Sequence, residues 1–392
     1  MKLDLSDASA LKTLKREIKK KNRRKNPITS IQIECLNAEF WVCAGASLSD
    51  DDLNTLFIHI GHAFPSLKKV SMKVFELPLP VTALKTLLLL TKNTLEEIDM
   101  EDVILKGSQE ELEALARTFK VHPTLKTIKL DWCNPVSGSL EPVFQGLCNI
   151  QTLNQVKICG SVLSVASLRV LCHKKNLKRL SLCDDELKDD AITAMADALE
   201  LNEDIKELSV RLCGLDPVTG IRFANVLRVN NTLEKLELRI KDSDWNSYGA
   251  AFRNALEVND TLKTLEIFID GLNTDVPSAV QHLIDGALYK HPSLKSVHIA
   301  LRGIYSPGII KREFEGPDQA MLENNLVLEQ LKIDGMDLPH QSTVLLRANR
   351  AGRQILMRNL NARDVWTSKL IEHREDIALT DYLISTNPSI LL

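Results

Sequence analysis

The chain carries four copies of one short pattern: Leu177-Lys-Arg-Leu-Ser-Leu182, Ile205-Lys-Glu-Leu-Ser-Val210, Leu233-Glu-Lys-Leu-Glu-Leu238 and Leu262-Lys-Thr-Leu-Glu-Ile267. In every copy the first, fourth and sixth residues are apolar and the residues between them are polar. The copies begin at positions 177, 205, 233 and 262, so the interval between them is nearly constant. A fixed period of this length is typical of a solenoid, in which each structural repeat stacks on its neighbours.

Each repeat is predicted to contain one strand and one helix. The fourth and sixth positions of the pattern alternate with polar residues, and a period of two is that of a strand with one buried face. After the first copy, Ile192, Met195, Ala196 and Leu199 recur at helical spacing. Strands stack about 4.8 Å apart, whereas helices need about 8–10 Å. The sequence therefore predicts a curved α/β solenoid (a horseshoe) with a parallel sheet on its concave side and helices on its convex side.

The repeat extends through most of the chain. A first, degenerate strand is expected at residues 28–33. Further copies begin at Leu67, Leu95, Leu125, Leu153, Leu294 and Leu328. The interval is shortest between positions 153 and 177 and longest between positions 294 and 328. We therefore divide the chain into a basic N-terminal segment at residues 1–27, a solenoid of about ten to eleven units at residues 28–341, and a helical C-terminal cap at residues 342–392.

Two segments depart from the repeat. Residues 303–308 form an insertion that is either a binding loop, as insertions in solenoids often are, or an ordinary surface loop. After residue 341 the pattern stops, and helical spacing predicts one helix at residues 342–360 and a second at residues 364–385. A solenoid needs a cover over the core of its last repeat, and these helices are expected to supply it.

The links that enter the strands are repeated as well, as in Val229-Asn-Asn-Thr-Leu233 and Val258-Asn-Asp-Thr-Leu262. Asparagine tolerates the left-handed conformation that ends a helix, so a structural role is expected for it. Asn230 and Asn259 also match the N-glycosylation signal. We favour the structural role because residues 1–7 do not resemble a secretory signal peptide.

The composition is that of a globular, non-membrane protein. Of the 392 residues, 44% are hydrophobic and 26% are charged, and the longest apolar run near the start, residues 87–90, is far too short to cross a bilayer. Eight cysteines occur without a C-x-x-C pair. Scattered free thiols of this kind indicate a reducing compartment, so an intracellular location is expected, either cytoplasmic or nuclear.

The N-terminal segment differs from the rest in charge. Residues 1–27 hold ten Lys or Arg and three Asp or Glu, whereas the whole chain has a net charge of −3. The densest cluster comprises Lys19, Lys20, Lys21, Arg23, Arg24 and Lys25. Three interpretations stay open: a solvated helix on which Leu11, Leu14 and Ile18 share a face, a nuclear-import signal, and an arm that binds nucleic acid. The absence of aromatic residues in the cluster speaks against base stacking, so nucleic-acid binding is the least favoured.

The sequence contains none of the motifs that would indicate an enzyme. It has no Gly-rich phosphate loop, no H-E-x-x-H and no serine elbow. His59 and His62 have a spacing that can ligate a metal, but no third ligand is visible nearby, and the acids of Ser49-Asp-Asp-Asp52 suit a helix start better than a metal. Cys159 and Cys183 are expected side by side on adjacent strands, where they could crosslink under oxidation or help to hold a metal, but small residues of the sheet are the favoured interpretation. We therefore expect no catalysis, no cofactor and no metal.

The third, fifth and seventh positions of each copy are expected to project from the concave face. There they predict an acidic patch of Glu97, Asp99, Glu101 and Asp131, a basic patch of Arg179, Arg211, Lys235 and Arg239, and two flanking aromatic residues, Trp132 and Phe268. Aromatic and arginine side chains are the ones that most often anchor protein interfaces. The alternative is that charges on neighbouring strands pair with one another across the sheet.

The pattern Leu-x-x-Leu-x-Leu-x-x-Cys/Asn-x-Leu resembles that of leucine-rich repeats, and it is fullest at residues 125–133 and 205–215. The period of the four central copies is similar to that of the ribonuclease-inhibitor-like class, and the resemblance covers roughly residues 28–340. The segment Leu346-Arg-Ala-Asn-Arg-Ala-Gly-Arg353 also resembles the end of repeat proteins expanded in diatoms and related algae. The ninth position departs from Asn or Cys at Val103, Ser161, Asp185, Lys241 and Arg302.

The resemblance implies a non-catalytic protein that binds a protein partner through its concave sheet and the adjacent loops. Similar repeats also build Ran GTPase-activating proteins, so a regulator of a small GTPase is one alternative, although the long acidic tail common in that group is missing here. A nucleic-acid-associated protein that uses the basic arm is the other alternative. The identity of the partner and the oligomeric state stay open.

Overall fold

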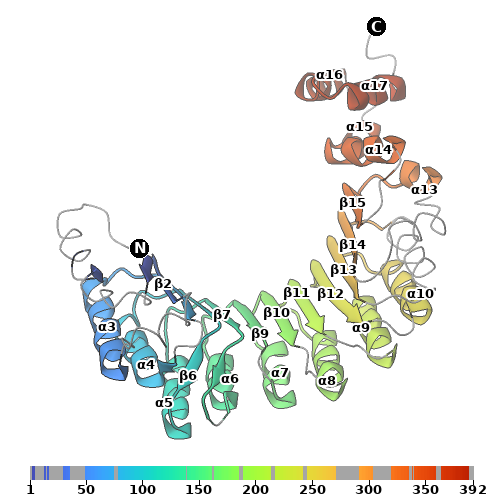
Figure 1. Cartoon of the computed structure of the whole chain (residues 1–392). Helices are drawn as coiled ribbons and strands as arrows, with labels where there is room; N and C mark the ends of the chain where they lie inside the picture. Colours follow the sequence, from blue (N-terminus) through green and yellow to red (C-terminus); the bar gives the residue numbers. More distant parts are fainter. Residues whose placement is uncertain are drawn as a thin grey trace. The chain divides into compact units, whose positions relative to one another are not determined.

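The computed structural model describes most of the repeat region and the C-terminal helices (Figure 1). The described residues are 2–4, 13–14, 16, 30–35, 49–74, 78–137, 139–160, 163–184, 189–212, 217–241, 245–270, 291–302, 319–334, 338, 340–358 and 363–387. The chain divides into two compact units, Met1–Ala198 and Leu199–Leu392. Each unit is a stack of repeats with its own strands and helices.

The first unit contains a parallel sheet with helices along one of its faces. In sheet order its strands are β1 (Lys2–Asp4), β2 (Ser30–Cys35), β3 (Lys69–Val74), β5 (Glu97–Glu101), β7 (Thr127–Asp131), β9 (Gln155–Cys159) and β10 (Arg179–Asp184). Its helices are α3 (Asp50–Ala63), α4 (Val81–Leu90), α5 (Gln109–Lys120), α6 (Glu141–Cys148), α7 (Val165–Cys172) and most of α8 (Asp189–Glu200). A small second sheet joins β4 (Leu79–Pro80), β6 (Ile104–Lys106) and β8 (Asn134–Pro135).

The second unit continues the same alternation and ends in a group of helices. Its parallel strands are, in order, β11 (Glu207–Leu212), β12 (Lys235–Lys241), β13 (Thr264–Asp270), β14 (Ser296–Arg302) and β15 (Gln330–Ile333). The helices are α9 (Pro217–Val229), α10 (Trp245–Leu256), α13 (Gln319–Asn324), α14 (His340–Arg350), α15 (Arg353–Arg358), α16 (Arg363–Glu372) and α17 (Ile377–Thr386).

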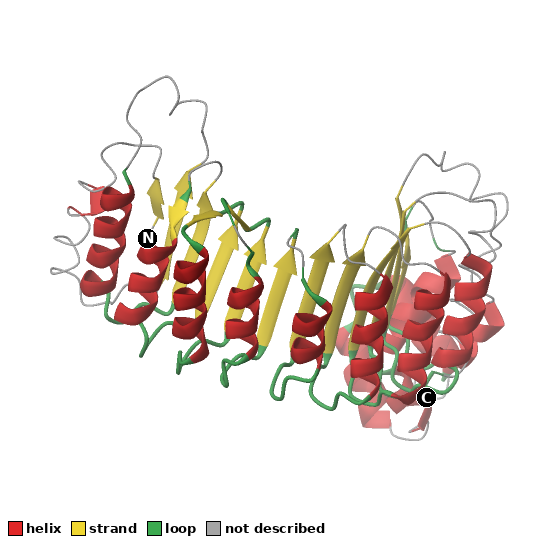
Figure 2. Cartoon of the chain, turned by 90° about the horizontal axis from the view of Figure 1, so that it is seen from below, coloured by secondary structure: helices red, strands yellow, loops and turns green. Residues whose placement is uncertain are grey.

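The leucines that begin the repeats form the core of each unit. Leu67, Leu95, Leu125 and Leu153 are all fully buried, and a strand begins two residues after each of them, as at Lys69 after Leu67. Within each unit the sheet lies on the inner, concave side and the helices lie on the outer side (Figure 2). The predicted α/β leucine-rich repeat solenoid is therefore confirmed.

The acidic residues after Ser49 lie in the first turn of helix α3, as predicted. The Ser49 side chain accepts a hydrogen bond from the Asp52 backbone N–H at 3.1 Å, and the Asp52 carboxylate accepts from the Ser49 backbone N–H at 3.1 Å. The hydrogen bonds from Ser49 lower the pKa of Asp52 below its ordinary value. This reciprocal capping box satisfies two N–H groups that a helix start otherwise leaves without partners.

The repeated asparagines do not adopt the left-handed backbone conformation that was predicted for them. Among the described residues other than glycine, positive φ angles occur at Asp102, Trp132 and Asn176, and Asn230 is not one of them. The Asn230 side chain instead donates to the carbonyl oxygens of Leu199 at 2.7 Å and Asn202 at 3.1 Å.

The Asn230 side-chain oxygen completes the link between two repeats. It accepts hydrogen bonds from the backbone N–H groups of Thr232 at 3.0 Å and Leu233 at 2.9 Å. One buried amide therefore joins the end of one helix to the start of the next repeat's strand. Asn259 makes the same four kinds of contact, to Leu227, Asn230, Thr261 and Leu262.

The same turn is held by other polar groups elsewhere in the stack. His291 Nδ1 takes the place of the asparagine oxygen and accepts from the N–H of Leu294 at 3.0 Å. In the first unit, hydroxyls bridge the repeats: Thr124 donates to the Leu95 carbonyl at 2.7 Å and Thr152 donates to the Leu125 carbonyl at 2.6 Å. Buried backbone groups need such partners because water does not reach them.

The N-terminal segment differs from the expectation in one respect. Residues 2–4 form β1, which pairs in parallel with β2, so the start of the predicted basic segment belongs to the sheet. The first repeat strand runs over Ser30–Cys35 instead of residues 28–33. The basic cluster at residues 19–25, the insertion at residues 303–308 and Cys213, at the ninth position of the copy that begins at Ile205, lie outside the described residues.

Each of the two helices predicted for the C-terminal cap is broken in two. Gly352, with φ at 93°, ends the first segment between α14 and α15. Between α16 and α17 a turn leads to Asp376, whose carboxylate accepts from the Leu379 N–H at 3.2 Å and starts a new helix. The breaks fold these helices around a small core that includes Leu356 and Trp366, each 1% exposed.

We predict that Asn230→Ala destabilises the second unit by about 2–4 kcal/mol, because two buried carbonyls and two buried N–H groups lose their partner. The measurement is urea-induced unfolding followed by circular dichroism. The matched control is Asn231→Ala, because Asn231 is the exposed neighbour in the same link. Equal unfolding midpoints for the two variants would contradict the bridging role.

Candidate protein-interaction surface

The outward strand positions of the first unit form three columns across the sheet. Their members, in sheet order, are Lys69, Glu97, Thr127, Gln155 and Arg179; then Ser71, Asp99, Lys129, Lys157 and Ser181; then Lys73, Glu101, Asp131, Cys159 and Cys183. Along β5 and β7 these residues are half-buried, whereas the residues between them are buried. The predicted outward positions therefore lie on the strand-side face, which we define as the sheet face away from the helices.

The acids of this face are paired with lysines of neighbouring strands. Glu97 Oε1 accepts from Lys69 Nζ at 2.8 Å and from Lys129 Nζ at 2.9 Å, and Lys129 also lies 3.7 Å from the Asp99 carboxylate. Lys157 Nζ lies 2.6 Å from Asp131, and Lys73 pairs with Glu101. The charges thus alternate in sign, which is the cross-strand pairing that the sequence left as an alternative to a purely acidic patch.

The pairing stabilises the ionised form of Glu97. Partial burial raises the pKa of this carboxyl, but the hydrogen bonds from Lys69 and Lys129 outweigh it and hold the pKa below its ordinary value of 4.5. At Lys157, burial lowers the pKa of the amine, but the hydrogen bond to Asp131 and the charges of nearby groups, Asp131 and Asp99 among them, together outweigh burial and raise the pKa. Glu97 and Lys157 therefore both keep their charges around neutral pH, and the strand-side face presents fixed positive and negative charges.

Trp132 stands at the end of β7 in an unusual backbone conformation. Its φ angle is 53°, its N–H donates to the Cys159 carbonyl at 2.8 Å, and 54% of its surface is exposed. Asp102 and Gly160 occupy the same place in the repeats on either side, with φ angles of 56° and 63°. A left-handed conformation is rare for a bulky side chain, and such residues often mark functional sites.

Gly160 provides the space in which the indole lies. A Cβ atom at position 160 would be 2.5 Å from the Trp132 ring carbons, which is far inside van der Waals contact. The ring therefore packs against the backbone of the next repeat while its other surface stays open. An exposed tryptophan that is already held in place is the kind of residue that anchors protein interfaces.

Charged side chains on the strand-side face of the second unit also form ion pairs with one another. Arg211 Nε donates to Glu237 Oε1 at 2.5 Å, and Lys235 Nζ lies 2.6 Å from Glu266 Oε1. Arg239 lies directly opposite Arg211 on β12 and is half-buried. Of the predicted basic residues, Arg179 is exposed on β10 of the first unit, opposite Gln155, whereas the other three lie together on β11 and β12.

Phe268 contacts both Arg211 and His298, which belongs to a second group of polar residues. The guanidinium of Arg211 lies 5.7 Å from the centre of the Phe268 ring, and the His298 ring contacts Phe268 edge-on, with 5.8 Å between ring centres. His298 Nε2 is 3.1 Å from the Asp334 carboxylate, which Lys332 also contacts at 2.9 Å. Burial raises the pKa of Asp334, but the hydrogen bonds from Lys332 and His298 outweigh it and lower the pKa.

The cysteines described on and beside β7, β9 and β10 are structural. Cys159 and Cys183 lie opposite each other on β9 and β10, as the sequence predicted, and both are free thiols. The hydrogen bond between these thiols, together with burial, raises the pKa of Cys159. Burial raises the pKa of Cys133 to about 12, and its thiol lies 3.6 Å from the Met100 carbonyl. Thiols in this state are poor nucleophiles and poor metal ligands.

Metal-binding clusters and membrane-spanning helices are both absent from the described residues. No group of three or more His, Cys, Asp or Glu side chains among them is arranged to hold a metal ion. His59 and His62 lie on α3 with no such group around them in the described ranges. In the same residues, no helix is both long enough and apolar enough to span a bilayer.

Comparison with known proteins adds little to this geometry. No family model matches the chain, and no curated protein matches it. Among solved structures, the chain is similar to one titled "Leiomodin-1 Actin-Binding Site 2 (ABS2)", with 18% sequence identity, coverage of 46% of this chain and 83% of that chain, and a TM-score of 0.26. A likeness at this level carries no argument about a partner, so the fold assignment rests on the repeats themselves.

The sequence predicted the acids and offered cross-strand charge pairing as an alternative, but it did not assign a lysine partner to each acid. The partners Lys69, Lys129 and Lys157 occupy outward positions of neighbouring repeats, so charge signs compared position by position would have found the pairing. Gly160 was overlooked because its role depends on Trp132 one repeat earlier. The signal for it was a glycine that directly follows the strand pattern.

We predict that Glu97→Gln lowers the free energy of unfolding by about 1–2 kcal/mol at pH 7, because Lys69 and Lys129 lose their shared counter-charge. The folded-state pKa of Glu97 lies below 4.5, so the carboxylate stabilises the fold above that pH and this contribution is lost as the pH falls through the folded-state pKa. Urea unfolding from pH 7 to pH 3 should therefore show the two proteins converging. Glu113→Gln on the exposed face of α5 is the control, and a difference that is independent of pH would contradict the pairing.

We also predict that Gly160→Ala destabilises the first unit by about 1–3 kcal/mol, because the new methyl group meets the Trp132 ring and alanine resists a positive φ. Thermal unfolding measures the loss of stability. Displacement of the indole should also change the tryptophan emission spectrum of the folded protein. An unchanged spectrum together with unchanged stability would show that the ring does not pack there.

Proposed function

We propose that this chain is a non-catalytic protein-interaction module that binds a protein partner through its strand-side faces. The observation that carries the proposal is Trp132, an exposed indole on a left-handed backbone directly after strand β7. Holding a bulky side chain in that conformation costs about 1–3 kcal/mol. The strand-end hydrogen bond at this position is made by the backbone N–H, so that hydrogen bond does not require an indole.

The charged rows beside Trp132 suit a specific partner. Lys73 pairs with Glu101 and Lys157 pairs with Asp131, and Trp132 directly follows Asp131 in the chain. Exposed pairs of this kind add little stability to the fold itself. Facing a partner with the opposite order of signs, however, they would fix its register and exclude partners with like charges. The indole would supply most of the affinity and the charges would supply the selectivity.

The row of Arg211, Phe268 and His298 supports a second contact region in the other unit. It combines an aromatic ring with an arginine and a histidine in contact with it. Aromatic and arginine side chains are enriched among the residues that dominate binding energy. Each region is proposed to contact the partner within its own unit.

We further infer that the chain is of the ribonuclease-inhibitor-like class and acts inside the cell. The nearly constant period of the central copies, with a full helix in repeats such as those of α8 and α9, supports the class. The free thiols of the described residues support a reducing compartment. The link to algal repeat proteins rests on residues 346–353 alone. No specific observation favours the GTPase-regulator or nucleic-acid alternatives, since the acids that suggested the first are paired with lysines.

The proposal predicts that Trp132→Ala weakens partner binding by at least about 30-fold, because a central aromatic anchor contributes about 2 kcal/mol or more. Partners would be captured with wild-type protein by crosslinking and mass spectrometry, and each would then be titrated as purified protein. The matched control is Val136→Ala, which shortens another exposed apolar side chain of the same unit.

A Phe268→Ala variant tests the second contact region in the same titrations. Circular dichroism would first confirm that all variants fold like the wild type. Full affinity in both Trp132→Ala and Phe268→Ala would refute binding through the strand-side faces. A purified GTPase whose hydrolysis the chain accelerates would replace the non-catalytic function with the regulatory one.

A further inference from the structure

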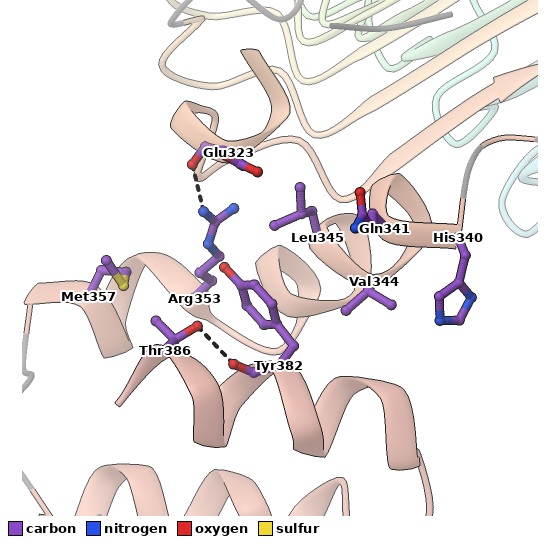
Figure 3. A pocket seen from close by; sticks show the side chains of 9 residues that line it. All are labelled: Glu323, His340, Gln341, Val344, Leu345, Arg353, Met357, Tyr382 and Thr386. Atoms are coloured by element: carbon purple, nitrogen blue, oxygen red, sulfur yellow. Dashed lines mark hydrogen bonds between the residues drawn. The ribbon is translucent and has the colours of Figure 1, made fainter. Parts of the chain in front are cut away.

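The C-terminal helices of the second unit enclose a pocket that the proposed function does not use. It has a volume of about 410 Å³ and is lined by residues of α13, α14, α15 and α17 (Figure 3). Val344, Leu345, Met357 and the ring of Tyr382 form apolar walls. Pockets that bind small molecules are typically this large and mostly apolar, with a few polar groups that orient the ligand.

Arg353 is the charged group of this pocket, and only 6% of it is exposed. Its guanidinium donates to the carbonyl of Glu323 at 2.5 Å and to the carbonyl of Leu322 and the side-chain oxygen of Asn349 at 3.4 Å each. All three acceptors are neutral oxygens. Arg353 Nε is buried without any acceptor, and no carboxylate of the described residues forms an ion pair with this guanidinium.

A buried cation without an ion-pair partner is costly to the fold. Burial lowers the pKa of Arg353, yet an arginine side chain remains protonated in proteins. The Tyr382 ring, 5.5 Å from the guanidinium carbon, and the charge of Glu323 raise the pKa of Arg353, but burial outweighs both. Figure 3 shows the Arg353 side chain between Glu323 and Tyr382, at the wall of the pocket. An anion that enters the pocket would supply what the protein does not.

The other charges around the pocket limit the kind of anion. The side chains of Glu323 and His340 line it and are exposed. The Glu323 carboxylate would repel a doubly charged group such as a phosphate, whereas one buried guanidinium matches one carboxylate in charge and in geometry. The apolar walls at Val344 and Leu345 would contact an uncharged body of the ligand.

We propose that this pocket binds a small monocarboxylic acid with an aromatic or aliphatic body. The carboxylate accepts hydrogen bonds from Arg353, and the body lies against Val344, Leu345 and Met357. The competing explanation is that Arg353 serves only to cap the last carbonyls of α13, in which case the pocket has no preference for an acid.

The test uses the full chain and a matched pair of probes, 4-phenylbutyrate and 4-phenylbutan-1-ol, titrated by isothermal calorimetry. Both probes carry the same ring and chain, but only the first carries a carboxylate. We expect the acid to bind at least about 10-fold more tightly than the alcohol, because hydrogen bonds to a charged group contribute about 1.5–3 kcal/mol. Equal affinities, or no binding of the acid at millimolar concentration, would overturn the proposal.

Two variants locate the binding. Arg353→Gln should abolish the preference for the acid and leave the affinity for the alcohol unchanged. Met357→Trp should weaken binding of both probes by filling the pocket, whereas Ile371→Trp, on the exposed surface of α16, should change neither. An unchanged affinity for the acid in either pocket variant would overturn the proposal. If circular dichroism shows that Arg353→Gln does not fold, the probe ratio in the wild type and the Met357→Trp titration still decide the question.

Discussion

The turn between helix and strand lies too deep for water to reach, and in the second unit a buried amide supplies the partners that its backbone groups need. Asn230 contacts the carbonyl oxygens of the preceding repeat and the N–H groups of its own repeat at the same time. Stacking in register is thereby tied to a specific hydrogen-bond pattern in addition to apolar burial. The proposed contact region around Phe268 depends on that register, because a slip would separate every cross-strand pair.

The strand-side faces show how such a stack can have a selective surface without a catalytic site. The charges at Glu97 and Asp131 are already paired, so they do not attract ions of one sign indiscriminately. Their value lies in their order along the sheet, which a partner either matches or does not. Trp132 and Phe268 add apolar contact area at fixed places within that order. The C-terminal pocket differs in kind, because there the buried guanidinium of Arg353 has no ion-pair partner among the described residues and its Nε has no hydrogen-bond acceptor.

The sequence predicted the repeats well because buried leucines at a fixed period leave few alternatives. It placed the strand starts, the outward positions and the pairing of Cys159 with Cys183. It did not reveal the role of Asn230, because the carbonyls that the side chain meets lie a full repeat earlier in the chain. The sequence also did not predict the left-handed backbone at Trp132, since local propensity favours a glycine in that conformation. It did not predict the helix break at Gly352, since local propensity allows an unbroken helix there.

The buried amides have one more consequence, which concerns the order of events during synthesis. Asn230 and Asn259 match the signal for attachment of a sugar chain, but in the folded chain they are 5% and 4% exposed. Their side-chain nitrogens already donate to two carbonyls each. Folding therefore closes both positions to the transferring enzyme, and a sugar attached beforehand would keep the neighbouring repeats apart. The stack and the glycan exclude each other, and only a chain made without the modification can assemble.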